Sequence, residues 1–125
     1  MTFICFKIQV IMTNCAKHFC STYELPSDIK MFDDCNEWTM WQKRGDPVLH
    51  IELGKWADIF LIAPLDANSL ANWRMQGLCD NLLTCTARAW DISKPLILCP
   101  AMNTKMYNHP ITDVHLKLLE SWDTI

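Results

Sequence analysis

The stretch WADIFLIAPLDANSL, residues 56–70, determines the fold class of this chain. Its apolar run over residues 57–63 predicts a parallel strand that is buried on both faces. Residues 67–75 follow with the pattern of a helix, which Asp66 or Asn68 can cap. A buried strand that passes directly into a helix is typical of an α/β fold.

Further elements are expected after this unit. The apolar run PLILC at residues 95–99 predicts a second strand, and Pro110 suits the first turn of a helix over residues 110–120. Between the two strands, Asp80 is predicted to cap a helix over residues 80–90. Strand, helix, strand and helix in this order predict a parallel sheet with right-handed crossovers. The other expected elements are a strand at 7–13, a short helix or turn at 16–19, an extended segment at 30–32, a helical turn at 36–42 and a helix or irregular turn at 48–56.

The composition predicts one domain with a hydrophobic core. The 125 residues leave room for a single domain, and half of them are hydrophobic. The net charge of −3 gives no basic surface, so no nucleic-acid partner is expected. No stretch reaches the roughly 18 apolar residues that cross a membrane, so we expect no membrane partner and a cytoplasmic location. Seven cysteines without zinc-type spacing predict free thiols, a reducing compartment and no metal site.

The stretch PAMNTKMY, residues 100–107, carries polar groups at the carboxyl end of the second predicted strand. Open α/β sheets bind their ligands at this end of the strands. A buried Asn103 would offer two donors and one acceptor to a carboxylate or an amide, with Met102 and Met106 keeping water away. The alternative is a loop with an Asx-turn and two core methionines, and this stretch alone leaves both interpretations open.

Four segments occur together in one order: PVLHI at 47–51, APLDANSL at 63–70, CDNLLTC at 79–85 and PAMNTKM at 100–106. With them the chain closely resembles the homo-oligomeric flavin-containing Cys decarboxylase family, from about residue 8 to about residue 118. The resemblance implies a single-domain α/β fold, a Rossmann-like or flavodoxin-like three-layer sandwich with a parallel sheet. It also implies FMN-dependent decarboxylation of 4′-phospho-N-pantothenoylcysteine to 4′-phosphopantetheine in coenzyme A biosynthesis, by a homotrimer that holds FMN between its subunits.

The same resemblance implies roles for individual residues. His50 matches the family's catalytic histidine, and an imidazole can take up and return a proton near neutral pH. Asn103 matches the residue that holds the substrate carboxylate, and Met106 matches an apolar neighbour of the reacting group. The positions that match flavin-contacting residues are Thr13, Phe19, Asp66, Ala67, Asn68, Ser69 and Ala101.

Other candidate groups are interpreted as structural. Trp38 and Trp41 lie three residues apart and are expected to pack in the core. Free cysteines in apolar runs usually behave as small hydrophobic residues. We therefore expect core thiols at Cys79, Cys85 and Cys99. The histidines His18, His109 and His115 are expected to be surface or capping residues.

The chain departs from the family pattern at both ends. Family members begin with a strand, a Gly-Ser-rich loop that holds the flavin phosphate, and a helix, all ahead of the segment that starts here near Ile8. They continue past Trp122 into a flap that carries a catalytic cysteine. Residues 1–125 are therefore interpreted as a partial flavoprotein domain without the first strand, loop and helix, and a chain without the flap cysteine is expected to stop at the decarboxylated enethiol. The alternative is a non-catalytic flavoprotein-like subunit or regulatory fragment that pairs with full-length chains.

Overall fold

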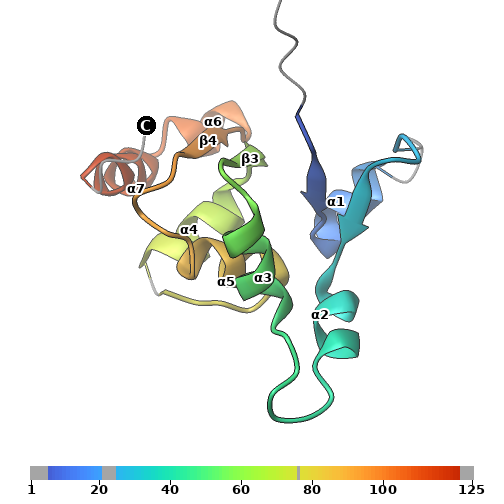
Figure 1. Ribbon diagram of the computed structural model, residues 1–125. Coiled ribbons are helices and arrows are strands. Elements are labelled where there is room, and N and C mark those ends of the chain that lie inside the picture. Colours follow the sequence, from blue (N-terminus) through green and yellow to red (C-terminus); the bar gives the residue numbers. More distant parts are fainter. Residues whose placement is uncertain (1–5, 21–24, 76, 122–125) are drawn as a thin grey trace, which may run out of the picture.

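The computed structural model describes residues 6–20, 25–75 and 77–121, and it combines strands with helices as predicted (Figure 1). The strands are β1 (Gln9–Ile11), β2 (Lys30–Phe32), β3 (Phe60–Leu65) and β4 (Leu96–Pro100). The helices are α1 (Asn14–Cys20), α2 (Asp34–Met40), α3 (Leu49–Trp56), α4 (Ala67–Met75), α5 (Leu82–Arg88), α6 (Thr104–Tyr107) and α7 (Pro110–Glu120).

The strands form two parallel pairs. β1 pairs with β2, and β3 pairs with β4, with Phe60 opposite Leu96. The register of β3 and β4 shifts between Ile62 and Leu65, a stretch that contains the cis peptide bond between Ala63 and Pro64. The predicted parallel pairing is thus confirmed. Within the described ranges it takes the form of two separate two-stranded ladders.

β3 is buried on one face only, so the expectation of burial on both faces is wrong. Ile62 and Leu65 are buried, whereas Leu61 is 56% exposed. The strand also begins later than predicted, because the backbone of Ala57 still closes the last turn of α3 by donating to the Leu53 carbonyl at 3.0 Å. Because both faces of β3 carry apolar residues, the sequence does not indicate which face packs against the core.

The larger core lies between the β3–β4 ladder and helices α4, α5 and α7. Its aromatic members, Phe60 and Trp90, contact each other with ring centroids 5.3 Å apart. The Trp90 indole N–H donates to the Lys94 carbonyl at 3.1 Å, so its polar atom is satisfied. This core fixes the carboxyl ends of β3 and β4, where the predicted ligand segments begin. Its buried members are Ile62, Leu65, Leu70, Ala87, Trp90, Leu96 and Leu119.

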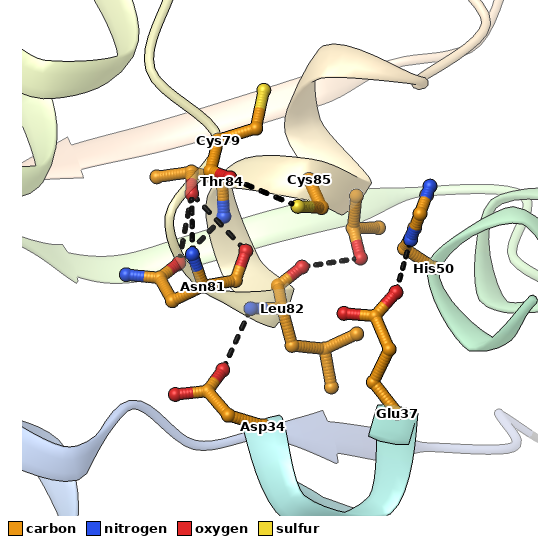
Figure 2. Close-up of polar contacts among 9 residues, drawn as sticks. Asp34, Glu37, His50, Cys79, Asn81, Leu82, Thr84 and Cys85 are labelled. Atoms are coloured by element: carbon orange, nitrogen blue, oxygen red, sulfur yellow. Dashed lines mark hydrogen bonds and ion pairs between the residues drawn. The ribbon is translucent and has the colours of Figure 1, made fainter. Parts of the chain in front are cut away.

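A smaller core joins the amino-terminal part of the chain to the rest. Leu49 and Leu53 of α3 are buried together with Leu82 of α5, and Ile11 and Phe32 of the first ladder pack against them. This packing brings α3 and α5 against the β1–β2 unit. The three helices α2, α3 and α5 consequently meet in one region of the molecule, which Figure 2 shows in close-up.

Asn81, and not the predicted Asp80, is the N-cap of α5. The Asn81 side chain accepts from the Thr84 backbone N–H at 2.8 Å, and the Thr84 hydroxyl accepts from the Asn81 N–H at 3.2 Å. This reciprocal pair is a capping box. Within the described ranges, the Asp80 carboxylate accepts a hydrogen bond from the Thr84 hydroxyl alone, at 3.4 Å. Asp and Asn are equally good N-caps, so cap preference alone could not predict which of these two adjacent residues starts the helix.

Several expectations for single side chains are wrong. Trp38 and Trp41 are exposed instead of packed in the core, and so are the thiols of Cys79 and Cys99. His115 is buried in α7, and no residue in the described ranges forms a hydrogen bond with its Nε2. His109, in contrast, caps α7 as expected, because its Nδ1 accepts from the Ile111 backbone N–H at 3.2 Å.

The six cysteines in the described ranges are free thiols: Cys15, Cys20, Cys35, Cys79, Cys85 and Cys99. Among the helices that the structure describes, none combines the length and the apolar character that crossing a bilayer requires.

Candidate functional site

The carboxyl ends of β3 and β4 bring two predicted ligand segments together. The Ala101 N–H donates to the Leu65 carbonyl at 2.9 Å, so the segment after β4 lies beside the segment after β3. The Asp66 carboxylate accepts from the Ser69 N–H at 3.1 Å and starts α4. The predicted contact positions Asp66, Ala67, Asn68, Ser69 and Ala101 therefore share one edge, as expected for parallel strands.

Asn103 is exposed in the single chain. Its Oδ1 accepts from the Lys105 N–H at 2.9 Å and caps the short helix α6, which is the Asx-turn of the alternative interpretation. Its Nδ2 has no partner among the residues that the structure describes. Met102 packs against the larger core, whereas Met106 is exposed beside Asn103. The turn therefore uses the acceptor of the amide and leaves its two donors for a ligand.

Thr13 and Phe19 belong to the first strand–helix unit. Thr13 follows β1, and its hydroxyl accepts from the Ala16 N–H at 3.1 Å at the start of α1. Phe19 is largely exposed on α1, where its ring meets the His18 ring edge-on at 5.4 Å between centroids. These contacts are local to α1, and they do not join the two residues to the β3–β4 edge.

His50 lies in the first turn of α3 and is bound to the Glu37 carboxylate of α2 through Nδ1 (Figure 2). The side chains are mostly buried, with 25% of His50 and 14% of Glu37 exposed. Figure 2 shows that Nε2 is directed away from Glu37. In the described part of the chain, the hydrogen bond of the His50 side chain is the one through Nδ1. His50 and Asn103 thus belong to two separate hydrogen-bonded groups within one chain.

Cys85 of α5 lies close to the pair formed by Glu37 and His50. Potential ligand atoms of Glu37, His50 and Cys85 lie within 4.8 Å of one another. Burial, and secondarily the charge of Glu37, raise the pKa of the Cys85 thiol to about 11. The thiol therefore keeps its proton at neutral pH, and it donates to the Cys79 carbonyl at 3.5 Å. Glu37 and His50 are bonded to each other, whereas the Cys85 thiol is bonded to the Cys79 carbonyl.

The raised pKa predicts slow alkylation of Cys85. At pH 8, a thiol with a pKa of about 11 holds roughly 100-fold less thiolate than an ordinary thiol, and the thiolate is the reactive form. We expect iodoacetamide to modify the exposed Cys35 and Cys79 first, as followed by peptide mass spectrometry. The variant Glu37→Gln should speed the reaction of Cys85, because it removes a negative charge that disfavours the thiolate. Alkylation of Cys85 at the rate of the exposed thiols would contradict the assignment.

A comparison with known protein families identifies the family of this chain. The Flavoprotein family profile matches residues 4–125. The chain belongs to the flavoprotein family. Among curated relatives of this flavoprotein, the mouse (Mus musculus) protein named phosphopantothenoylcysteine decarboxylase is 50% identical over 116 residues, which cover 93% of this chain and 55% of the mouse protein. The flavoprotein chain thus spans about half the length of the curated relatives it matches.

Solved structures confirm the predicted flavodoxin-like α/β fold of this flavoprotein. A cysteine-to-serine mutant of PPC decarboxylase in complex with pantothenoylaminoethenethiol superposes with a TM-score of 0.90 at 48% identity, over 94% of this chain and 64% of that chain. The FMN binding protein AtHal3 superposes with a TM-score of 0.88 at 49% identity, over 93% of this chain and 62% of that chain. Such scores over nearly the whole chain show that it shares the fold of both solved structures.

Proposed function

We propose that this chain serves in the FMN-dependent decarboxylation of 4′-phospho-N-pantothenoylcysteine to 4′-phosphopantetheine, a step of coenzyme A biosynthesis. The observation that carries the proposal is the 50% identity to the mouse protein of that name over 93% of this chain. The 48% identity to a structure that holds pantothenoylaminoethenethiol supports the same substrate class. The free cysteines of the described ranges suit a cytoplasmic location, where thiols stay reduced.

The edge formed by Asp66 to Ser69 and Ala101 is the part of the chain that fits a flavin. The side chains of Ala67 and Ala101 are small, so a planar ring can approach the backbone closely. The Asp66 carboxylate makes this edge better suited to the uncharged ring or ribityl chain than to the phosphate, since like charges repel. FMN, when bound, would supply the two-electron acceptor that makes loss of the cysteinyl carboxylate feasible.

The chain's own groups match the remaining needs of the reaction. The Nε2 atom of His50 is free to take a proton from the substrate and to return it. The Nδ2 atom of Asn103 has two donors available for the substrate carboxylate. Met106 lies exposed beside Asn103 and offers an apolar surface that excludes water once substrate is bound.

A homotrimer with FMN between subunits is the assembly that we propose. His50 and Asn103 belong to separate groups within one chain, and an interface between subunits can join them in one site. The exposed apolar side chains provide surface for such contacts, because large apolar side chains left in water favour association. They include Phe19, Trp38, Ile59, Leu61, Ile92 and Val114.

The test of this function begins with flavin binding. The purified chain is mixed with FMN and passed through a gel-filtration column, and flavin absorbance is measured in the protein peak. We expect FMN to elute with a trimer, and Ala101→Phe to weaken its retention by at least about tenfold, or about 1.4 kcal/mol. Ala89→Phe, at an exposed position after α5, is the matched control and should retain FMN.

Substrate turnover then separates the two candidate roles. Release of carbon dioxide from 4′-phospho-N-pantothenoylcysteine by the FMN complex is the result expected of the decarboxylase. Bound FMN without carbon dioxide release would favour the non-catalytic subunit. A protein peak without flavin would remove the support for both.

A further inference from the structure

We propose that Glu37 is a positioning residue that fixes the tautomer and orientation of His50, so that Nε2 presents its lone pair to the reacting group. The role of Nε2 rests on the proposed function. The contact between Glu37 and His50 does not, because it is formed within this chain. The two parts of the proposal can therefore be tested separately.

The chemistry of the contact determines the tautomer. An ionised carboxylate only accepts hydrogen bonds, so the Nδ1 atom that faces Glu37 must carry the hydrogen. In a neutral imidazole the other nitrogen, Nε2, is then the acceptor. Figure 2 shows Nε2 turned away from Glu37. A general base needs this arrangement of a held nitrogen and a free one.

Glu37 is held in place by the rest of α2. Asp34 lies three residues earlier, on the same face of the helix, and its carboxylate accepts from the Leu82 N–H of α5 at 2.7 Å (Figure 2). The start of α2 is fixed by a capping box between Asp33 and Asn36, with bonds of 3.0 and 2.9 Å. The helix therefore directs one carboxylate to α5 and the next to α3.

An ordinary surface ion pair does not account for this contact. The pair of Glu52 and Lys55 on α3 is such a surface pair, joined at 3.0 Å with 48% of the Glu52 side chain exposed. Only 14% of Glu37 is exposed, and a carboxylate taken out of water is costly unless its partner compensates for the lost hydration. The Glu37 carboxylate faces His50, which is the histidine of helices α2 and α3. This direction supports a positioning role for Glu37.

The first arm of the test measures the tautomer without any enzyme assay. The chain contains four histidines, and comparison with His50→Gln assigns the His50 imidazole in ¹⁵N NMR spectra. Spectra are recorded at about pH 9, above the range in which imidazole usually titrates. We expect the Nδ1–H form in the native chain. In Glu37→Ala the ratio of Nδ1–H to Nε2–H should fall by at least about tenfold, as expected on losing a hydrogen bond to a charged group.

Two further variants control for loss of folding and for a general effect of removing a carboxylate. Glu37→Gln keeps the shape of the side chain, so it can be measured even if Glu37→Ala does not fold. It should shift the ratio in the same direction as Glu37→Ala. Glu52→Ala removes an exposed carboxylate from the neighbouring turn and should leave the ratio unchanged. An unchanged ratio in both Glu37 variants overturns the proposal, whatever the chain's activity.

The second arm measures the effect on turnover. Loss of the partner that orients a metal-bound histidine typically costs about 10–100-fold in activity, and we take the same range for His50. We expect Glu37→Gln to lower kcat for carbon dioxide release by this factor with little change in KM, because the substrate contacts remain. A tautomer shifted to mainly Nε2–H with unchanged kcat would show that Glu37 orients His50 but that His50 does not carry the chemistry, which is a failure of the proposed function alone.

Discussion

Replacing His50 by glutamine is expected to slow carbon dioxide release by about 10²–10⁴-fold, the range that a positioned general acid or base contributes. Glutamine can still donate to Glu37, so the contact between α2 and α3 survives. It cannot take up a proton, and the chemical step loses its base. The rate is measured with the FMN complex at saturating 4′-phospho-N-pantothenoylcysteine, together with FMN retention on the column.

The matched control for this variant is His109→Gln. His109 lies exposed at the start of α7 and caps that helix through Nδ1. Its replacement should cost about 0.5–2 kcal/mol of stability through the lost cap and should leave the rate of the folded enzyme unchanged. Equal rates for His50→Gln and the native chain, with FMN still bound, would remove His50 from the reaction.

Sequence motifs located part of the candidate site. The PVLHI segment pointed to His50, and the segments after the two predicted strands pointed to the edge formed by Asp66 and Ala101. Those residues are found from sequence because parallel strands place their carboxyl ends together wherever the strands are recognised. Glu37 and Cys85 lacked such a signal. They reach His50 only through the packing of α2, α3 and α5 around Leu49 and Leu82, which no local pattern encodes.

The fold was predictable to a similar extent. Apolar runs and their boundaries predict the strands β3 and β4 and the helices α4 and α7. The parallel pairing of β3 with β4 is confirmed. The burial of one face of β3 could not be predicted, because Leu61 and Ile62 are equally apolar but only Ile62 meets the core. The exposure of Trp38 escaped prediction for the same reason, since hydrophobicity does not distinguish a core contact from a surface that awaits a partner.

The second large expected effect concerns stability. Leu119→Ala is expected to lower the free energy of unfolding by about 2–5 kcal/mol, because it removes buried methyl groups and leaves a cavity. Leu119 is 4% exposed and packs in the larger core with Leu96 of β4 and Leu70 of α4. The loss is a large share of the roughly 5–15 kcal/mol that stabilises a typical domain. Urea unfolding at equilibrium measures it, with an unchanged m-value as the check on two-state behaviour.

Leu118→Ala provides a matched control one residue earlier in α7. Leu118 is 39% exposed, and the change in helix propensity is the same at both positions, so the difference between the two variants isolates burial. The larger loss at Leu119 should also reach the site. The Thr112 hydroxyl of α7 donates to the Met106 carbonyl at 2.6 Å, and it thereby ties the helix to the loop that carries Asn103. A loosened α7 should therefore weaken substrate binding at concentrations of urea too low to unfold the chain. Equal stabilities of the two variants would show that α7 is not part of the core that supports this loop.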